Sequence, residues 1–522
     1  MGRKILLITT DQQRWDALGC NGGDVARTPV VDRLAADGIR YERPYVQNTI
    51  CMPSRATILT GQHPRSHGLV ASGIPLAEDA MSIATLVGNA GYKTAIVGKA
   101  HFEPVLSGDL RFAENRLAAE DSTGPYRGFD HAELAVHGPV GMTHYAKWLN
   151  EHHPEAAAGF VKPLDPSLGG DTGVPELVYN PVPRELYHTD WVAERVTAWL
   201  DSLDDDSDWL CWMSFPDPHH PWDPPASERH RVNWRDLDLP EGYLAPDEAT
   251  EVLGQKPGHW LAWYDGSGAN IEGACMPSVV PSRLTEDNFR EVNAIVHISN
   301  ELVDEACGRV LDAIAARGWS DDTDVFYTAD HGEFQGDYGL LYKGPYHVDA
   351  LMRVPLIWRP APSAGVDPAV VSEPVGLQDL APTICSIAGV PAPEEMDGES
   401  LPTGPGSGRE RALVDWESTL DTGYRMRTLV RDGWICTAYE ANATDWGLPT
   451  AMLGQMLGIE LPARIEYEGT EGELYNLAED PLQMVNRWDD PAAASVRSDL
   501  VADLYDNLPP LRGPLTPPQG IA

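Results

Sequence analysis

The sequence predicts an α/β fold, with a large mixed, mostly parallel sheet flanked by helices and a smaller C-terminal α+β domain. Over residues 1–390, strand-like apolar runs alternate with helix-like runs, a pattern typical of parallel sheets. Residues 391–408 are rich in Pro and Gly, as linkers are. A chain of 522 residues is long enough for a large domain and a smaller one, each with its own hydrophobic core. We therefore expect one domain at residues 1–400 and a smaller one at residues 401–522.

The elements of the larger domain follow from periodicity and from helix start and stop signals. The first is an apolar run that predicts a buried strand, and Thr28 before Pro29 is a helix start signal. The expected order is strand Lys4–Thr10, a helix from Pro29 to before Gly38, helix Ser82–Gly91, strand Lys93–Gly98, helix Thr189–Leu203, strand Trp209–Phe215, helix Thr285–Arg317 and strand Asp324–Ala329. The last strand leads to Asp330 and His331 at its carboxyl end, where open α/β sheets bind ligands.

The remaining segments are less regular. Residues 104–187 and 221–284 have weak periodicity and are expected to be rim loops around a pocket or plain surface insertions. Residues 411–440 predict a β-hairpin that turns at residues 431–433. The tail beyond Leu508 is Pro-rich, and a homo-oligomer in which it reaches a neighbouring subunit stays open.

Charge and cysteine usage limit the class of protein. The chain has 38 Lys and Arg against 79 Asp and Glu, a formal net charge of -41, so nucleic acid and anionic membranes are not expected as partners. No apolar run approaches the ~20 residues of a membrane span. Seven scattered cysteines indicate a reducing compartment. A strand predicted from Lys4 leaves no room for a leader, so we expect a cytoplasmic protein unless a leader was removed before residue 1.

The strongest local motif runs from Cys51 to Gly61, with Pro53 two residues and Arg55 four residues after the cysteine. A cysteine that opens a short helix lies in the positive potential of the helix N-terminus. Residues 275–279 repeat the first four residues of the motif but have Val279 in the place of the arginine, so we interpret that repeat as coincidence. The full run resembles the signature of the sulfatase family, in which the cysteine is converted to formylglycine.

The resemblance covers nearly the whole chain, from the first strand to a Glu-Leu-Tyr-Asn motif at residues 473–476. It implies membership of the alkaline phosphatase superfamily and a single divalent cation. The ligands that it implies are Asp11, Gln12, Asp330, His331 and the modified Cys51. Independently of the family, hard oxygen ligands with one His suit Ca²⁺, Mg²⁺ or Mn²⁺. Because many members have a second Asp where this chain has Gln12, the choice stays open between Ca²⁺, which we favour, and Mn²⁺.

The resemblance also assigns the basic groups that hold a sulfate. Arg55 would orient the hydrated aldehyde, and Lys99 would contact a sulfate oxygen. The imidazole expected to bind sulfate or protonate the leaving group is that of His219, with His220 as the less favoured choice. The last two members are His101, which would deprotonate the formylglycine, and Lys343, which would bind the anion and help protonate the leaving oxygen. Lys99 and Lys343 are notable because the chain has only seven lysines.

The reaction that the resemblance implies is hydrolysis of R–O–SO₃⁻ to an alcohol or phenol and sulfate. One hydroxyl of the hydrated aldehyde attacks sulfur while His219 or Lys343 protonates the departing oxygen. His101 then takes the proton of the other hydroxyl, which re-forms the aldehyde and releases sulfate by C–O cleavage. The expected partners are a small-molecule sulfate ester and a maturation enzyme that generates formylglycine.

Three other functions stay open. Phosphonate monoester or phosphodiester hydrolysis uses a similar ligand set, although those hydrolases tend to lack the Lys and His that stand here at residues 99 and 101. A metal-dependent phosphoglycerate mutase has the superfamily fold, but we find no Ser nucleophile or two-metal ligand set for it. A non-catalytic binder of sulfated ligands would keep Cys51 unmodified. The cluster at His131, His137, His144, His152 and His153 matches no strong metal spacing and is interpreted as structural.

Overall fold

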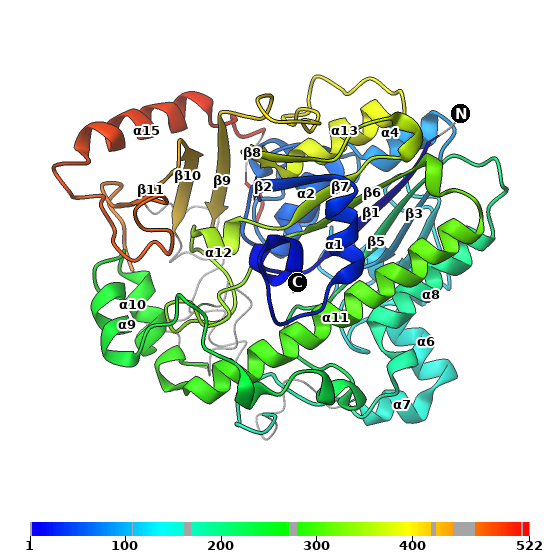
Figure 1. Ribbon diagram of the computed structural model, residues 1–522, viewed down its shortest axis with the longest axis horizontal. Helices are drawn as coiled ribbons and strands as arrows, with labels where there is room; N and C mark the ends of the chain where they lie inside the picture. Colours follow the sequence, from blue (N-terminus) through cyan, green and yellow to red (C-terminus); the bar gives the residue numbers. More distant parts are fainter. Residues whose placement is uncertain are drawn as a thin grey trace.

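An eight-stranded mixed sheet forms the centre of the larger domain (Figure 1). The computed structural model describes residues 3–106, 108–160, 169–268, 270, 279–418, 424–441, 465–512 and 515–520. The strand order is β4-β3-β5-β1-β6-β7-β2-β8. The strands are β1 (Lys4–Thr10), β2 (Ile39–Tyr45), β3 (Lys93–Gly98), β4 (His131–Leu134), β5 (Trp209–Ser214), β6 (Thr323–Ala329), β7 (Leu356–Arg359) and β8 (Ala369–Gly376).

Parallel pairing dominates this sheet. β1 lies between β5 and β6, and β3 lies between β5 and β4, all in parallel. Only β7 runs antiparallel to its neighbours β6 and β2, while β8 is parallel to β2. The parallel block places the carboxyl ends of five adjacent strands at one edge of the sheet, as the sequence predicts for a ligand site.

Helices cover both faces of the sheet, and the residues of β1 show why. Ile5 and Leu7 contact one core cluster, and Leu6 and Ile8 contact the other, so the strand is apolar throughout. The first cluster is built with α2 (Cys51–Thr60), α4 (Ile83–Asn89) and α13 (Leu380–Ile387). The second is built with α1 (Pro29–Ala36), α6 (His144–His152), α8 (His188–Asp201) and α11 (Glu286–Ala316). In Figure 1, α4 and α13 of the first group lie above the strands, and α6, α8 and α11 of the second group lie below them.

The predicted elements of the larger domain are present, with small shifts at their ends. The long helix begins where the sequence predicts, and the structure shows why: the Thr285 side chain and Asn288 form a reciprocal capping box at its start. The remaining helices of this domain are α3 (Pro64–His67), α5 (Ala113–Ala119), α7 (Pro154–Gly159), α9 (Pro246–Leu253), α10 (His259–Asp265) and α12 (Asp349–Met352).

The interpretation of residues 104–187 as irregular is wrong in part, because β4 lies within them and forms an edge strand of the main sheet. β4 has only four residues, too few for a clear two-residue period. α5, α6 and α7 lie in the same stretch. Residues 161–168 and 271–278, the latter including Cys275, lie outside the described residues.

A four-stranded antiparallel sheet follows residues 391–408. It consists of β9 (Arg411–Glu417), β10 (Arg425–Arg431), β11 (Trp434–Glu440) and β12 (Gly472–Asn476), and α15 (Ala494–Asn507) packs on one face. The predicted hairpin turn is confirmed: Asp432 and Gly433 have φ of 53° and 78°, as a two-residue hairpin loop requires. β9 adds a third strand to the predicted pair.

The end of the chain lies on the larger domain. The backbone N–H of Arg512 donates to the carbonyl of Arg65, and that of Gln519 donates to the carbonyl of Gly73. The described part of the Pro-rich tail therefore lies against its own chain. Among the described residues, no helix combines the length and apolar character needed to cross a bilayer, and the six described cysteines form no disulfide.

Candidate active site

The carboxyl ends of the central strands bring the predicted site residues together. β1 is followed by Asp11 and Gln12, β3 by Lys99 and His101, β5 by His219 and β6 by Asp330 and His331. Helix α2 approaches the same edge, since the Ser54 hydroxyl donates to the carbonyl of Asp330 at 2.5 Å. The sequence spacing alone spreads these residues over more than half the chain, and the parallel topology unites them.

Four buried side chains place possible metal-ligand atoms within 4.8 Å of one another: those of Asp11, Cys51, Asp330 and His331. Nδ1 of His331 lies 2.9 Å from the carbonyl of Gly332, which leaves Nε2 available, 3.6 Å from Oδ1 of Asp11. That Nε2 and that Oδ1 are buried and have no hydrogen-bond partner among the residues that the structure describes. Buried polar atoms normally have a partner, so this donor set fits a hard divalent cation.

Gln12, the remaining predicted ligand, lies beside this group. Its φ of 64° is in the left-handed region, where a non-glycine residue is strained. The backbone N–H of Gln12 donates to Oδ1 of Asp330 at 3.1 Å, and this hydrogen bond stabilises the strained backbone conformation. Its side-chain oxygen accepts a hydrogen bond from Nζ of Lys343 at 2.7 Å. Gln12 is thus at the site, with its amide oxygen shared with a lysine.

Cys51 is the first residue of α2 and is buried. Burial by itself raises the pKa of the thiol, but the nearby charges of Lys343 and Lys99 outweigh it and lower the pKa below its usual value. The side chain also belongs to an apolar cluster with Trp416, Tyr439 and other residues of the C-terminal sheet. The smaller sheet therefore packs directly against the predicted nucleophile.

Arg55 lies one helical turn after Cys51 and is fully buried. Its Nε donates to Oδ2 of Asp330 at 2.7 Å, and Nη2 donates to Oδ2 of Asp11 at 3.3 Å. Nη1 donates to the Ser214 hydroxyl and to the carbonyl of Lys99, both at 2.7 Å. The guanidinium thus holds both carboxylates of the metal-ligand group and ties the helix to β1, β3, β5 and β6.

The Gly-Lys-x-His segment places two more basic groups at the site. Nζ of Lys99 forms a 2.5 Å ion pair with Oδ2 of Asp11. His101 is buried and has φ of 58°, and within the described part of the chain neither ring nitrogen has a hydrogen-bond partner. Burial first, and then the charges of Lys99 and Arg55, lower the pKa of this imidazole well below its usual value. His101 is therefore neutral and has a free nitrogen that is able to accept a proton.

A carboxylate that the sequence did not single out fixes the backbone of His101. Glu114, on α5, accepts the N–H groups of His101, Phe102 and Glu103 at 3.1, 2.7 and 3.2 Å, and also the Tyr126 hydroxyl at 2.9 Å. Three successive N–H groups on one carboxylate hold the strained loop in place. Glu114 lies inside a segment that the sequence predicts as irregular, and no motif marks it.

The two neighbouring histidines, His219 and His220, have different partners. Nε2 of His219 accepts a hydrogen bond from Nζ of Lys343 and lies 3.9 Å from Oδ1 of Asp11. His220 turns away, with Nδ1 2.7 Å from Oε2 of Glu176. Burial and the charge of Lys343 lower the pKa of His219 well below its usual value, so its imidazole is neutral. Of the two histidines, His219 is the one that contacts the ammonium group of Lys343.

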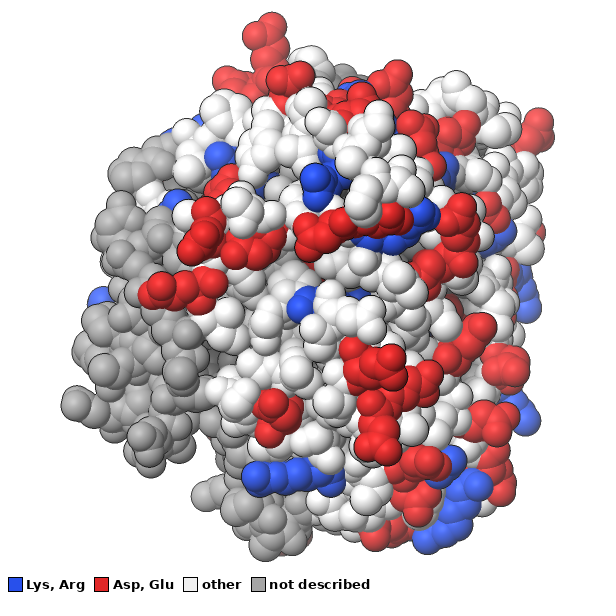
Figure 2. Space-filling view, turned by 90° about the vertical axis from the view of Figure 1, so that its left-hand side faces the viewer, with Lys and Arg blue, Asp and Glu red and all other residues white. Residues whose placement is uncertain are grey.

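The site concentrates positive charge in an acidic protein. Arg55, Lys99 and Lys343 are buried around the ligand group, although the net charge of the chain is -41. Figure 2 shows one face of the surface, on which Asp and Glu side chains are spread widely among fewer Lys and Arg. An anion is therefore attracted to this interior site rather than to that surface.

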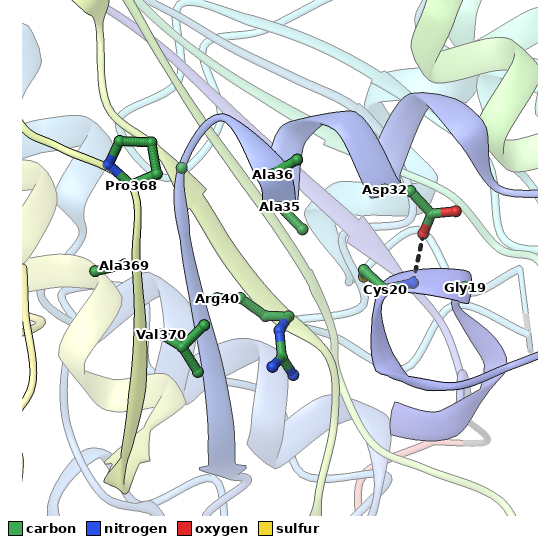
Figure 3. Close-up of a pocket in the computed structure, with 10 residues that line it drawn as sticks. Gly19, Cys20, Asp32, Ala35, Ala36, Arg40, Pro368, Ala369 and Val370 are labelled. Carbon is green, nitrogen blue, oxygen red and sulfur yellow. Dashed lines mark hydrogen bonds between the residues drawn. The ribbon is translucent and has the colours of Figure 1, made fainter.

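A hollow lies elsewhere on the molecule, between α1, β2 and β8 (Figure 3). Its volume is about 650 Å³, and Cys20, Asp32 and Arg40 contribute polar groups to it. The backbone N–H of Cys20 donates to Oδ1 of Asp32 at 2.7 Å. Burial and this carboxylate raise the pKa of the Cys20 thiol to about 12, so it is not a nucleophile near neutral pH. This hollow lacks the reactive groups of the strand-end site.

Comparisons with known proteins identify the family of this chain. The model of the sulfatase family matches residues 3–390. The arylsulfatase of Clostridium perfringens is 28% identical over 417 residues, which are 77% of this chain and 78% of that protein. The multifunctional alkaline phosphatase superfamily protein PehA of Trinickia caryophylli is 25% identical over 455 residues, 82% of each chain.

A solved structure confirms the predicted fold class. The phosphonate monoester hydrolase of Agrobacterium radiobacter superposes with a TM-score of 0.73 and 23% identity, over 97% of this chain and 95% of that one. At this identity the likeness concerns the fold alone. The family model, by contrast, covers most of the chain, including Asp11, the Cys51 motif and Asp330. The chain therefore belongs to the sulfatase family, a family of sulfuric ester hydrolases.

Proposed function

We propose that this protein hydrolyses sulfate monoesters with a formylglycine derived from Cys51 and one divalent cation. The observation that carries the proposal is the position of Cys51: at the start of α2, within 4.8 Å of three metal-ligating side chains. Around it, Lys99 and Lys343 supply the positive charge that an anionic ester needs. A maturation enzyme that oxidises Cys51 is the implied partner.

The cation would be held by Asp11, Gln12, Asp330, His331 and the modified residue 51. The unpartnered atoms of Asp11 and His331 support this set, and its oxygen-rich character favours Ca²⁺, with Mn²⁺ as the alternative. When bound, the cation would supply Lewis-acid stabilisation of negative charge beside residue 51. Gln12 would contribute a neutral amide oxygen, which leaves fewer ligand charges than a second Asp.

Different side chains would carry out the two proton transfers of the reaction, one at the formylglycine and one at the leaving oxygen. His101, neutral and without a hydrogen-bond partner at either nitrogen, would accept the proton of the formylglycine hydroxyl when sulfate departs. On the other side, Nζ of Lys343 donates to Nε2 of His219. A proton on Lys343 is thus available to the leaving oxygen, and His219 keeps that ammonium in place.

Phosphonate monoester or phosphodiester hydrolysis is a second candidate, favoured by the combination of Gln12 with Asp330 and His331. Lys99 weighs against this second candidate, because phosphonate monoester hydrolases tend to lack a Lys at this position. In this chain Nζ of Lys99 forms an ion pair with Asp11 at 2.5 Å. His101 adds a neutral base. We favour sulfate esters, with activity on phosphoesters as a side reaction.

The mass of one peptide and a substrate comparison test the proposal. Trypsin releases residues 41–55, since Pro44 blocks cleavage after Arg43. In protein made with the maturation enzyme, this peptide should be lighter by about 18 Da, the change from thiol to aldehyde nucleophile. Rates on aryl sulfates should exceed those on phosphonate monoesters. Turnover by protein whose Cys51 is wholly unmodified would overturn the mechanism, and unmodified, inactive protein would favour the binder.

Removal of divalent cations is expected to abolish activity and lower the unfolding temperature. Without a cation, the unpartnered Oδ1 of Asp11 and Nε2 of His331 stay buried and unsatisfied. Added Ca²⁺ or Mn²⁺ at 100 times its Kd should stabilise the fold by about 2.7 kcal/mol. Thermal unfolding of chelated protein across a series of cations measures this, with Mg²⁺ included to rank the ions. An unchanged unfolding temperature with every cation would contradict the predicted site.

Substitution of Glu114 is expected to impair turnover through His101. Glu114→Ala removes the acceptor of three N–H groups, so the imidazole moves and kcat falls by about 10- to 100-fold, as small misplacements of catalytic groups do. Glu114→Gln keeps an acceptor and should recover part of the loss. Exposed Glu120, at the end of the same helix, provides the control Glu120→Ala, with unchanged kcat. Full activity in folded Glu114→Ala would show that His101 does not depend on it.

A further inference from the structure

The edge strand β4 delivers a histidine to the same end of the sheet as the predicted site residues. β4 runs parallel to β3, with Leu134 paired to Gly98 at their carboxyl ends. Beyond the strands, the N–H of Ala135 donates to the carbonyl of Gly98 at 3.0 Å, which keeps the segments that follow β3 and β4 side by side. Lys99 follows β3 directly, and His137 follows β4 by three residues. The fifth parallel strand thus contributes to the site like the other four.

His137 is the outermost of three neighbouring imidazoles: its ring is tilted against the ring of His219, on which the ring of His220 stacks. Its ring centroid lies 4.6 Å from that of His219, with an angle of 31° between the planes. The ring of His220 lies on His219 as well, at 4.2 Å and 18°. His137 is partly exposed, whereas His219 and His220 are buried. His219 therefore has one buried imidazole neighbour and one at the surface side of the site.

The two ring nitrogens of His219 have different hydrogen-bond partners, and the orientation of the ring must be kept for both contacts to exist. Its Nδ1 is bonded to the carbonyl of His220, an acceptor, so the proton of the neutral ring is on Nδ1. Nε2 consequently offers its lone pair, which accepts the hydrogen bond from Lys343. A rotation of the ring about its Cβ–Cγ bond would break both contacts. Backbone and lysine define the two ends of the ring, and the neighbouring rings restrict its plane.

The inner neighbour is fixed by a hydrogen bond of its own. Nδ1 of His220 lies 2.7 Å from Oε2 of Glu176, and the Tyr342 ring lies 4.6 Å from the His220 ring on an edge contact. The inner face of His219 is thus supported by a residue that cannot easily turn. Support of the outer face depends on the ring of His137, which the short strand β4 brings into place.

We propose that His137 is a positioning residue for His219: as the outermost of the three rings, it keeps Nε2 of His219 directed at Lys343, which delivers the proton to the leaving oxygen. The inference rests on the proposed function, because it assigns the leaving-group side of that reaction. It requires the flat ring of His137 and not its nitrogens. A phenyl ring at this position should therefore replace it, whereas a methyl group should not.

The test compares H137A and H137F with wild type and with H131A on a series of aryl sulfates. His131 lies on the same strand, is partly exposed and pairs with Glu133, so H131A should leave kcat unchanged. Protonation matters most when the leaving phenol is weakly acidic. We expect H137A to lower kcat by about 10- to 100-fold for such phenols, the scale of a misplaced acid–base group, and by no more than about threefold for nitrophenyl sulfate. H137F should regain most of this loss, with KM nearly constant throughout.

Two results would overturn the proposal: equal losses for H137A and H137F, which would mean that the nitrogens of His137 act, or a loss that is the same for all leaving groups. Failure of the proposed function itself has a different signature. Wild type would then hydrolyse phosphonate monoesters but not sulfates, and the same leaving-group series on aryl phosphonates still decides the role of His137. For inactive protein, ¹⁵N shifts of the His219 ring serve: the Nδ1–H tautomer should be lost in H137A and kept in H137F.

Discussion

Replacement of Cys51 by Ala is expected to abolish sulfate ester hydrolysis in a protein that still folds. The side chain is small, so the change leaves a small cavity at the start of α2, while it removes the atom that is to become the nucleophile. Loss of a covalent nucleophile lowers kcat by about 10⁴-fold or more, and the remainder comes from binding and electrostatic stabilisation. Initial rates on an aryl sulfate, measured with matched protein concentrations and unfolding temperatures, give the result.

A second thiol provides the matched control. Cys20 is partly exposed and its thiol has a pKa raised to about 12, so Cys20→Ala should retain full activity. A hydrazide probe for aldehydes adds a readout that does not depend on turnover: wild type and Cys20→Ala should be labelled, and Cys51→Ala should not. Wild-type rates in Cys51→Ala would show that residue 51 is not the nucleophile and would overturn the proposed mechanism.

Much of the central fold is predictable from the sequence because the central strands are buried on both faces. β1, β5 and β6 are apolar runs with helices between them, so the presence of these strands and the position of their carboxyl ends follow from the pattern, whereas their order in the sheet does not. The site residues that lie directly after these strands follow as well. The strands beyond this centre, such as β2 with its Arg, Glu and Pro and the short β4, have no comparable pattern. Tertiary pairing, rather than local sequence, makes them strands.

The missed site residues share one physical cause. Glu114 and His137 act through contacts between segments that the sequence leaves unplaced, and a lone Glu or His carries no spacing signal. His137 becomes predictable only once β4 is known to lie beside β3. The structure adds contacts of Arg55 that the sequence does not predict: its donors bind the carboxylates of Asp11 and Asp330. The orientation of the aldehyde hydrate by Arg55 stays a prediction.

Arg55→Ala is expected to remove activity and to destabilise the protein strongly. Asp11 and Asp330 are both buried, and the guanidinium contacts each of them. Removing one partner of a buried ion pair costs about 3–5 kcal/mol, because the other charge stays buried without compensation. Activity should fall with it, since the carboxylates that are to hold the cation lose their orientation. Denaturant unfolding and initial rates measure the two effects separately.

The variant Arg409→Ala is a control that distinguishes the loss of stability on breaking a buried ion pair from the loss of catalysis. It pairs with the buried carboxylate of Asp379, outside the strand-end site, so Arg409→Ala should destabilise the fold but leave the kcat of folded protein unchanged. Arg55→Lys should recover part of the stability but little activity, because an ammonium cannot span both carboxylates as the guanidinium does. Arg409→Ala keeps the residues that are to hold the cation, so Ca²⁺ or Mn²⁺ should stabilise it as much as the unaltered protein. Arg55→Ala changes the charge around Asp11 and Asp330, so the same cation should stabilise that variant by a different amount. Equal stabilisation of the two variants would mean that Arg55 does not affect cation binding.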